Sequence, residues 1–321
     1  MPRPIMLGVV GDSAAGKTTI TRGLVRILGE DQVTHVGLDD YHRYDRKQRS
    51  ERSVTPLHPG ANYMDIMEQH LRHLRAGEPI LKPVYQHTDG TFGAPKYVEP
   101  REFAVLEGLL GYHTDDLCDL YDVRVYLAPP EPLRRKWKVD RDCSRRGYTT
   151  DQVLTELDRR EVDSAEFIRP QQRRADMVVS FQPAQDGGAA LDAELLLRPD
   201  LPHPDLAPFV ESGRGGISVE ERDVDRFIRI PADVAPDDAA AIEEAVWQKM
   251  HFARHLRTEH LGEYTVGTEL HRSETLAIVQ VLVLYHLVTA KATVALGGNG
   301  ARNASEREQE EAPEPADAVA S

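Results

Sequence analysis

The segment at residues 11–18, which reads GDSAAGKT, constrains the fold of this chain more than any other feature of the sequence. It matches the pattern G-x-x-x-x-G-K-[ST], whose glycines let successive backbone N–H groups point toward one phosphate. A short apolar run at 5–10 precedes the segment, and apolar spacing predicts a helix over about 17–28 directly after it. A strand, a glycine-rich turn and a helix in this order predict the first unit of a nucleotide-binding α/β sheet.

The phosphate-binding turn also predicts which residues contact a nucleotide. The Lys17 ammonium is expected to reach the β- and γ-phosphates of ATP, and the Thr18 hydroxyl is expected to bind Mg²⁺. The pattern alone does not distinguish a kinase from another ATPase or from a GTPase. The residues predicted to bind ATP are Gly11, Asp12, Ser13, Ala14, Ala15, Gly16, Lys17, Thr18 and Thr19.

Short apolar strands alternate with helical segments beyond the phosphate-binding turn. Their lengths and spacing separate strands of about five residues from amphipathic helices of ten or more. The expected elements are strands at 33–38, 103–106, 123–127 and 177–181, helices at 63–75 and 130–163, a polar loop at 40–62, and an extended segment or hairpin at 80–102.

This alternation predicts an α/β fold, a P-loop NTPase-type mostly parallel sheet with helices on both faces. Beyond about 184 the chain mixes Pro, Gly and acidic residues with short apolar runs, so a smaller C-terminal α+β region is expected to complete the sheet. The expected divisions are a P-loop core at 1–183 with a lid at about 134–170, a C-terminal region at 184–296 that ends in a buried or interface helix, and a disordered acidic tail at 297–321.

Two acidic positions follow apolar strands, at the sheet edge where parallel strands place their ligands. Asp39, with Asp40 beside it, follows the second strand. Its carboxylate could accept a proton from an acceptor hydroxyl, or it could cap the loop that follows. Glu107 follows the run FAVL and occupies the position from which a carboxylate binds Mg²⁺ beside a phosphate-binding turn.

Six segments occur in a fixed order along the chain: GDSAAGKTT, GLDDYHRYDR, HPGANYMDIM, KPVYQHTDGTFGAP, FAVLEGLL and KVDRDCSRRGY. In this combination the chain resembles the phosphoribulokinase/uridine kinase family from about 5 to 183. The resemblance resumes at SETLAIVQVLVLYHLV, whereas 184–270 match only loosely. It implies a P-loop kinase, and Asp-Asp-Tyr-His followed by Asp-Arg favours the branch that converts ATP and D-ribulose 5-phosphate to ADP and D-ribulose 1,5-bisphosphate.

The resemblance also implies roles for individual residues. Asp39 corresponds to the general base that takes the proton from the 1-hydroxyl of the sugar. Taken alone, the basic run after it would be typical of a solvated loop. The implied catalytic residues are Asp39, Lys17, Arg141 and Asp142, the implied metal ligands are Thr18 and Glu107, and the implied substrate-binding residues are His42, Arg46, Arg49, Tyr85, His87, Lys138 and Arg146.

Residues 134–146 read RRKWKVDRDCSRR and concentrate positive charge in a chain whose net charge is -14. A basic cluster beside a nucleotide site predicts a lid that closes over ATP, in preference to a solvated helix face. The resemblance implies that Arg141 stabilises the charge that develops on the transferred phosphoryl group. Asp142 would orient Arg141 or act as a second carboxylate near Mg²⁺, and Arg159 and Arg160 match a further basic pair.

The chain has two cysteines, Cys118 and Cys143, and their spacing indicates neither a metal site nor a disulfide framework. Light-regulated members of the family carry a redox-active cysteine in the phosphate-binding turn, where this chain has Ala15. We therefore expect its activity to be insensitive to mild dithiol oxidation.

A sequence pI near 5.4 argues against binding to nucleic acid or to a membrane surface. The apolar run at 276–294 contains Gln280, His286 and Lys291, which favours a buried or interface helix over a membrane span. The N-terminus shows no signal-peptide pattern. We expect a cytoplasmic enzyme with a small sugar phosphate as substrate, and the resemblance suggests a homodimer or higher homo-oligomer.

Three alternative functions stay open on this sequence: a uridine/cytidine kinase, a kinase of another sugar phosphate, and an ATP-binding regulator without catalysis. Arg46 and Arg49 favour a phosphorylated acceptor, because a nucleoside has no phosphate for them to bind. An intact catalytic set argues against a regulator, since a protein without turnover is free to lose any member of it. The set is Lys17, Asp39, Glu107 and Arg141.

Overall fold

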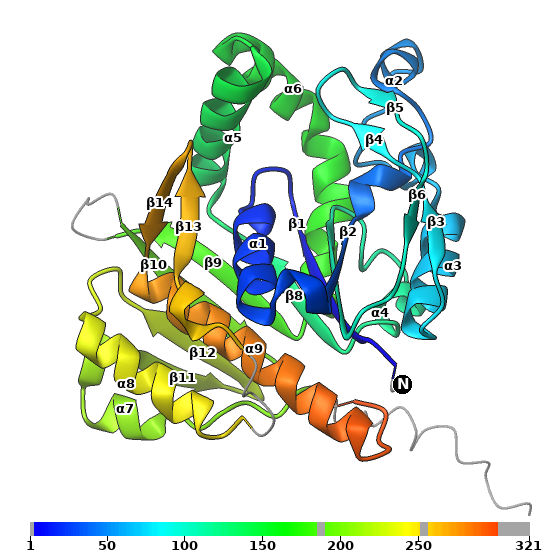
Figure 1. Cartoon of the computed structure of the whole chain (residues 1–321). Coiled ribbons are helices and arrows are strands. Elements are labelled where there is room, and N and C mark those ends of the chain that lie inside the picture. The colour runs from blue at the N-terminus through cyan, green and yellow to red at the C-terminus, as the bar shows by residue number, and fades with distance from the viewer. Residues whose placement is uncertain (1–2, 185–189, 251–255, 301–321) are drawn as a thin grey trace, which may run out of the picture.

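Eight strands form one sheet through the middle of the molecule (Figure 1). The computed structural model describes residues 3–184, 190–250 and 256–300. The strand order is β11-β12-β10-β9-β8-β1-β7-β2. These strands are β1 Ile5–Gly11, β2 Val33–Gly37, β7 Phe103–Gly108, β8 Val123–Leu127, β9 Met177–Pro183, β10 Leu191–Leu197, β11 Ser218–Arg222 and β12 Asp225–Ile230.

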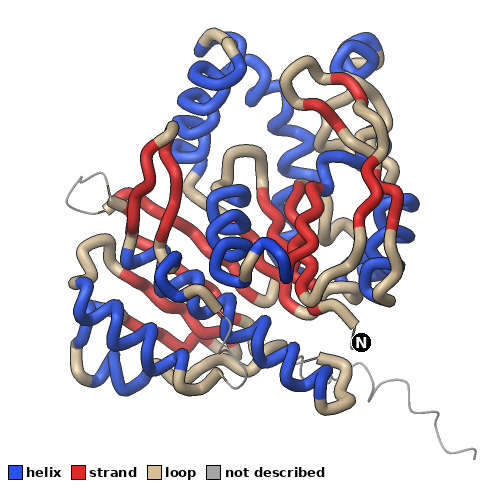
Figure 2. Tube along the Cα trace, in the orientation of Figure 1, coloured by secondary structure: helices blue, strands red, loops and turns tan. Residues whose placement is uncertain are grey.

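The five strands from β9 to β2 are parallel, and β10, β12 and β11 continue the sheet in antiparallel register. The parallel strands are apolar because both faces of the sheet are covered. Every residue of β1 is buried. The α/β fold expected from the sequence, a mostly parallel sheet with helices, is therefore confirmed (Figure 2).

Alternate residues of the strands pack against helices on opposite faces. On one face, Leu7 and Val9 of β1 share a cluster with Leu24 of α1. On the other face, Met6 shares a cluster with Leu71 of α3. The helices of the first face are α1 Lys17–Leu28, α8 Pro236–Trp247 and α9 Glu274–Ala295, and those of the second are α3 Met64–Arg75 and α4 Asp115–Cys118.

Two structures rise beyond the carboxyl ends of the parallel strands, on either side of the phosphate-binding turn (Figure 1). One is the helix pair α5 and α6, which turns at Gly147 with a φ of 69° that suits glycine. The other consists of two small hairpins, β3 with β6 and β4 with β5. Their bounds are α5 Glu131–Arg146, α6 Thr150–Asp163, β3 Ile80–Lys82, β4 Tyr85–Gln86, β5 Thr91–Phe92 and β6 Lys96–Val98.

The prediction of a loop over 40–62 is wrong in one respect, because this segment contains the short helix α2, Arg46–Glu51. The helix shows no apolar periodicity, because none of its residues is apolar and the one that it buries is Arg49. Its start is fixed by a capping box in which the Asp45 side chain accepts from the Gln48 N–H and the Gln48 side chain accepts from the Asp45 N–H.

In the C-terminal region, helices are interspersed with antiparallel strands along the chain, and α9 packs on both β10 and α8 (Figure 2). Besides β10 to β12 and α8, the region contains α7 Ala207–Glu211 and a hairpin, β13 Glu263–Val266 and β14 Glu269–Arg272, that lies along α1. Of the tail expected at 297–321, the part from 301 onward lies outside the described residues.

Helix α9 is, among the described residues, the one helix long and apolar enough to cross a membrane. It is apolar around its whole circumference, because it lies between the sheet, α1 and α8 (Figure 1). Two polar side chains within it, Gln280 and His286, are fully buried. The packing is that of a core helix.

Candidate active site

The phosphate-binding turn connects β1 to α1 at the middle of the sheet. Gly11 is required by space, since a Cβ atom there would lie 2.6 Å from the carbonyl oxygen of Leu127 on β8. Gly16 precedes α1 with a φ of 96°, and Ala14 adopts a φ of 66°, which is uncommon for a residue with a side chain. This conformation leaves the first N–H groups of α1 facing the turn, where they form an anion site.

Lys17 lies at the start of α1, and its ammonium bridges the turn. Nζ donates to the carbonyl oxygens of Gly11 at 2.8 Å and Asp12 at 2.9 Å. Burial lowers the pKa of Lys17, while the carboxylates of Asp39 and Glu107 act against that shift. Lys17 is therefore within electrostatic reach of both acidic strand ends, as the sequence predicts for a residue that contacts phosphates.

Asp12 is buried and holds the turn in shape. Its carboxylate accepts from the Ser13 N–H at 2.6 Å and from the Ser164 hydroxyl. Arg134 of α5 lies 3.5 Å from the same carboxylate and donates to the Ser13 carbonyl at 3.0 Å. Arg134 thus connects the lid helix to the turn, a contact that the sequence did not predict.

Glu107 at the end of β7 faces the first turn of α1. The Thr18 hydroxyl lies 3.4 Å from its carboxylate, and the Thr21 hydroxyl donates to it at 2.9 Å. Burial alone would raise the pKa of Glu107, but contacts with His35 and Thr21 and the charge of Lys17 hold it below its ordinary value. The carboxylate is therefore ionised at neutral pH.

The side chains of Thr18 and Glu107 fit Mg²⁺, because both present oxygen atoms beside the phosphate-binding turn. Within the described ranges, no cluster of three or more His, Cys, Asp or Glu could hold a metal ion. Mg²⁺ commonly takes one or two protein ligands and completes its shell with phosphate oxygens and water.

Asp39 and Asp40 occupy a 3₁₀ turn after β2, residues Leu38–Tyr41, and their environments differ. The Asp40 carboxylate accepts from the buried Lys82 ammonium and, at 2.8 Å, from the Tyr85 N–H. The Asp39 carboxylate forms no hydrogen bond or ion pair with any residue that the structure describes, and it is only partly buried. Asp40 therefore has a structural role, whereas Asp39 is free to contact an acceptor.

Tyr85 lies at the centre of an aromatic cluster next to Asp39. Its ring contacts His42, His87 and Phe92 edge-on, at centroid distances of 4.7, 5.1 and 5.8 Å. Burial lowers the pKa of His42 to about 4, so this imidazole is neutral at physiological pH. The structure thus brings together three of the predicted substrate-binding residues, His42, Tyr85 and His87, from two separate segments.

Arg46 and Arg49 extend from α2 toward the same cluster. Arg49 is buried and donates to the Tyr44 carbonyl and the Tyr85 hydroxyl, both at 2.5 Å, and Arg46 donates to the His87 carbonyl at 2.7 Å. These acceptors are uncharged. Because no carboxylate among the described residues pairs with either guanidinium, both retain positive charge that a phosphate could neutralise.

The basic residues of α5 gather around Asp142. Its carboxylate lies 2.6 Å from the Lys138 ammonium, 2.8 Å from Nε of Arg141 and 3.4 Å from Arg146. A second nitrogen of Arg141 lies 3.5 Å from the Ser13 hydroxyl, at the phosphate-binding turn. One carboxylate thus holds three cations, and it directs Arg141 toward the turn.

Two further predicted residues pair with a carboxylate of their own helix. Arg159 and Arg160 of α6 both bind the Glu156 carboxylate on their own helix, at 2.9 and 2.6 Å. Their charge is therefore already paired, and the structure shows no contact between them and the phosphate-binding turn.

Sequence reasoning missed three participants: Arg134, His35 and Lys82. Arg134 belongs to the basic run at 134–146, but its contacts with the phosphate-binding turn depend on how α5 packs. His35 lies 3.4 Å from the Glu107 carboxylate because β2 and β7 are neighbours. The contact of Lys82 with Asp40 depends on the folding of the hairpins over the site.

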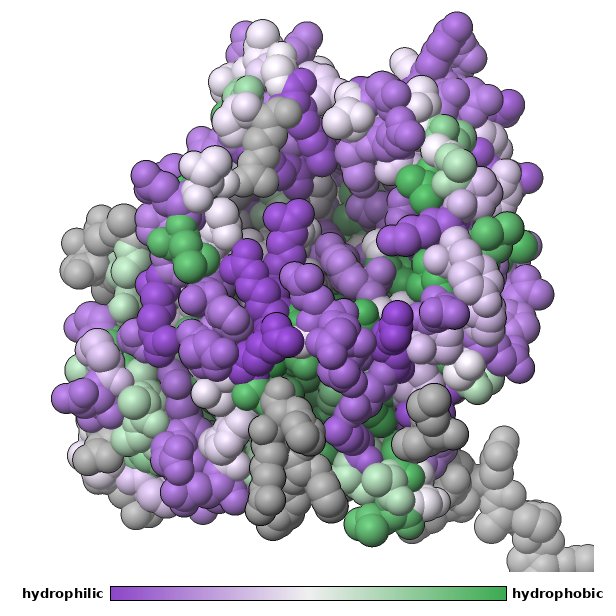
Figure 3. Space-filling model, in the orientation of Figure 1, coloured by the Kyte–Doolittle hydropathy of each residue, from purple (hydrophilic) through white to green (hydrophobic). Residues whose placement is uncertain are grey.

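A hollow lies between α5 and α6 on one side and the hairpin segment on the other, and hydrophilic residues predominate along its walls (Figure 3). A parallel sheet, a phosphate-binding turn, two acidic strand ends and the basic helix α5 define a P-loop protein of the kinase class. A model of the phosphoribulokinase/uridine kinase family matches residues 6–187, more than half of the chain. The chain belongs to this family.

Two kinds of relative share the matched region. The phosphoribulokinase of Synechocystis is 37% identical over 185 residues, which cover 58% of this chain and 56% of the relative. The uridine kinase of Oceanobacillus iheyensis is 32% identical over 181 residues, 55% of this chain and 86% of the relative. The chain thus spans about half the length of the curated phosphoribulokinases that it matches.

A solved structure extends the likeness in fold into the C-terminal region. The phosphoribulokinase from Rhodobacter spheroides superposes with a TM-score of 0.59 and 20% identity, and the match covers 79% of this chain and 98% of that one. At this identity the match shows a shared fold.

Proposed function

We propose that this protein transfers the γ-phosphoryl group of ATP to the 1-hydroxyl of D-ribulose 5-phosphate, which gives D-ribulose 1,5-bisphosphate and ADP. Asp39 is the general base. Phosphoribulokinases of Synechocystis and of chloroplasts are among the similar proteins, and they support this choice of substrate.

The observation that carries the proposal is the position of Asp39. Its charge acts on Lys17 of the phosphate-binding turn and on His42 and His87 of the aromatic cluster, so it lies between the nucleotide side and the acceptor side. The carboxylate forms no hydrogen bond or ion pair with another described residue. A general base needs this arrangement, because it must approach the acceptor hydroxyl within hydrogen-bond distance.

On the nucleotide side, the turn binds the phosphates through its N–H groups and through Lys17. Mg²⁺, held by Thr18 and Glu107, would neutralise charge on the β- and γ-phosphates when bound. Arg141, held by Asp142, supplies positive charge to the transferred group, and Arg146 and Lys138 add to the field. Closure of α5 and α6 excludes water, which would otherwise compete as the acceptor.

On the acceptor side, Arg46 and Arg49 provide the charge that a 5-phosphate requires. Tyr85 and the neutral His42 offer hydrogen-bonding groups for the sugar hydroxyls, and His87 lies near Asp39 and the lid cations. The oxygen of the 1-hydroxyl attacks the γ-phosphorus while its proton passes to Asp39. The bond from the γ-phosphorus to the bridging oxygen breaks, and ADP leaves.

A second candidate is a uridine kinase, which the 86% coverage of the Oceanobacillus relative favours. The two candidates differ in the acceptor, since uridine carries no phosphate. The unpaired charge on Arg46 and Arg49 is the structural reason to prefer a phosphorylated acceptor.

The test is a coupled assay of ADP release with ATP, Mg²⁺ and one acceptor at a time: D-ribulose 5-phosphate, ribose 5-phosphate or uridine. We expect rapid turnover with D-ribulose 5-phosphate alone, lost in Asp39→Asn and kept in Glu30→Gln, an exposed carboxylate at the far end of α1. Turnover on uridine or on ribose 5-phosphate would identify a different kinase. ATP binding without turnover on any of the three would contradict the proposal.

We also propose that the enzyme is cytoplasmic and that it assembles as a homodimer or higher homo-oligomer. Light scattering of the purified protein measures the assembly directly. A mass of 36.0 kDa, that of one chain, would contradict it.

A further inference from the structure

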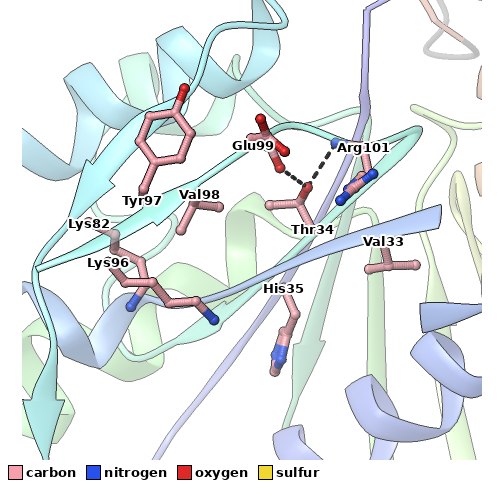
Figure 4. A pocket seen from close by; sticks show the side chains of 9 residues that line it. All are labelled: Val33, Thr34, His35, Lys82, Lys96, Tyr97, Val98, Glu99 and Arg101. Carbon is pink, nitrogen blue, oxygen red and sulfur yellow. Dashed lines mark hydrogen bonds between the residues drawn. The ribbon is translucent and has the colours of Figure 1, made fainter. Parts of the chain in front are cut away.

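A cavity of about 270 Å³ lies at the outer edge of the sheet, and its lining includes no residue of the phosphate-binding turn. One wall is β2, the edge strand, and the other is the hairpin of β3 and β6 with the chain that follows it (Figure 4). The Thr34 hydroxyl fixes the two walls together, since it donates to the Glu99 carbonyl and accepts from the Arg101 N–H, both at 2.8 Å. The cavity is therefore built by tertiary contacts across 65 and 67 residues of sequence.

The lining of this cavity is basic, although the chain as a whole is acidic. It includes His35, Lys82, Lys96 and Arg101 but only one carboxylate, Glu99. Figure 4 shows the Lys82 and Lys96 ammonium groups and the His35 ring on one side, and the Glu99 carboxylate on the other.

Two of these cations are free to bind a ligand. The side chains of Lys96 and Arg101 form no hydrogen bond or ion pair within the part of the chain that the structure describes, and both residues are exposed. Unpaired cations around a concave, partly apolar surface are the features of a site for a small anion.

Two other residues of the lining, Lys82 and His35, connect the cavity to the candidate active site. Lys82 is buried, and its ammonium donates to Asp40, the neighbour of Asp39. His35 lies 3.4 Å from Glu107. A charge placed in the cavity would therefore act on both acidic strand ends through a single intervening side chain.

We propose that this cavity binds a small phosphorylated anion and that its occupation lowers the rate of the kinase site. The regulatory part rests on the proposed function, whereas the binding part does not. A bound dianion competes with Asp40 for the Lys82 ammonium. Asp40 also accepts from the Tyr85 N–H, so it connects the turn that carries Asp39 to the strand that carries Tyr85. When the ion pair of Asp40 with Lys82 weakens, this connection becomes looser.

The binding test uses inorganic phosphate as the probe and hydrogen–deuterium exchange as the readout. A non-hydrolysable ATP analogue and Mg²⁺ are kept saturating, so that phosphate does not occupy the phosphate-binding turn. We expect phosphate to slow the exchange of amides at 33–35 and 96–101. The effect should disappear in Lys96→Ala/Arg101→Ala and persist in Lys249→Ala, which removes an exposed lysine elsewhere.

Absence of protection in the wild-type protein, or protection that survives in the double variant, would overturn the site. Equal protection by succinate would overturn the preference for a phosphorylated ligand. Failure of the ATP analogue to protect residues 11–18 would count against the proposed function instead, and the cavity would then be tested without the analogue.

The regulatory test measures kcat at saturating ATP and acceptor while phosphate is titrated. Competition at the active site raises KM but leaves kcat unchanged, whereas occupation of the cavity lowers kcat. We expect a decrease of about fivefold, at the lower end of the usual coupling between sites, with the double variant unaffected and its basal kcat preserved. An unchanged wild-type kcat, or an equal decrease in the double variant, would overturn the regulatory role.

Discussion

The Lys138 ammonium lies 2.6 Å from the Asp142 carboxylate, one helical turn along α5, and both side chains are almost completely buried. Burial lowers the pKa of Lys138 to about 7, and the charges of Arg141 and Arg160 add to the effect, although Asp142 opposes it. The pKa of Asp142 lies below its ordinary value because these cations outweigh its burial. The pair is therefore fully charged only on the acid side of neutrality.

This pair predicts a pH dependence of activity. As the pH rises through about 7, Lys138 loses its proton. The free enzyme then has one positive charge fewer on α5 to attract the phosphates of ATP. We expect kcat/KM for ATP to fall on the alkaline side, and we expect Lys138→Arg to keep its activity to higher pH because arginine stays charged. Identical alkaline limbs in the two proteins would contradict this role.

Substitution by asparagine is expected to lower activity at Asp39 and to lower stability at Asp40. Asp39→Asn removes a carboxylate without a protein partner, so we expect kcat to fall by about 10²–10⁴-fold with an unchanged Tm. Asp40→Asn leaves the buried Lys82 ammonium without its counter-charge, and we expect about 3 kcal/mol of destabilisation. The double variant Asp40→Asn/Lys82→Met should recover most of that loss. A stable Asp40→Asn protein would show that the pair is not structural.

Arg134 and Arg141 contact the phosphate-binding turn from the same helix but predict different kinetic effects. Arg141→Ala should lower kcat by about 10²–10³-fold with a small change in the ATP KM, since its charge matters most in the transition state. Arg134→Ala removes contacts that shape the turn, and we expect the ATP KM to rise about tenfold. Steady-state kinetics separate these outcomes, and an unchanged kcat in Arg141→Ala would remove that residue from the catalytic set.

Local patterns of the sequence predicted the core of the fold well. The predicted helix at 17–28 and the strand at 123–127 agree with α1 and β8, because glycine marks the start of the helix and four apolar residues around Arg124 mark the strand. Helix α2 escaped prediction because its sequence, RKQRSE, has no apolar periodicity. Only the capping pair Asp45 and Gln48 marked its start.

The site was predictable wherever a motif carried it, and unpredictable wherever it depended on packing between distant segments. Lys17, Asp39 and Glu107 follow strands of one parallel sheet, so topology brings them together. The contacts of Lys82 with Asp40 and of Arg134 with Ser13 join residues 42 and 121 positions apart. Such contacts depend on where a hairpin and a lid helix come to lie, which local patterns do not specify.

The two cysteines predict that oxidation does not switch the enzyme. Cys118 is buried on α4, and burial raises the pKa of its thiol, so the reactive thiolate is scarce. Cys143 belongs to α5, which Figure 1 places at the other end of the molecule from α4, and the phosphate-binding turn has Ala15. We expect equal activity after mild dithiol oxidation and after dithiothreitol treatment. Reversible inactivation would contradict this.

The buried His286 pairs with the half-buried His203, and the proton positions of both rings follow from their partners. Nε2 of His203 donates to the Arg198 carbonyl at 2.7 Å, because a carbonyl can only accept. Nδ1 of His203 therefore accepts from Nε2 of His286, at 3.1 Å. Nδ1 of His286 is then an unprotonated, buried nitrogen without a hydrogen-bond partner among the described residues.

This pair predicts that the fold loses stability as the pH falls. Burial and the neighbouring His203 lower the pKa of His286 to about 3, against an ordinary value of 6.5. Between these two pH values, His286 binds a proton in the unfolded chain but stays neutral in the folded protein. Stability is full above pH 6.5, and from pH 7 to pH 5 this histidine alone removes about 2 kcal/mol from the free energy of unfolding. His286→Gln retains a donor for His203 but does not titrate. Urea unfolding at both pH values should therefore show a loss about 2 kcal/mol smaller in the variant, and equal losses would show that His286 carries a charge in the folded protein.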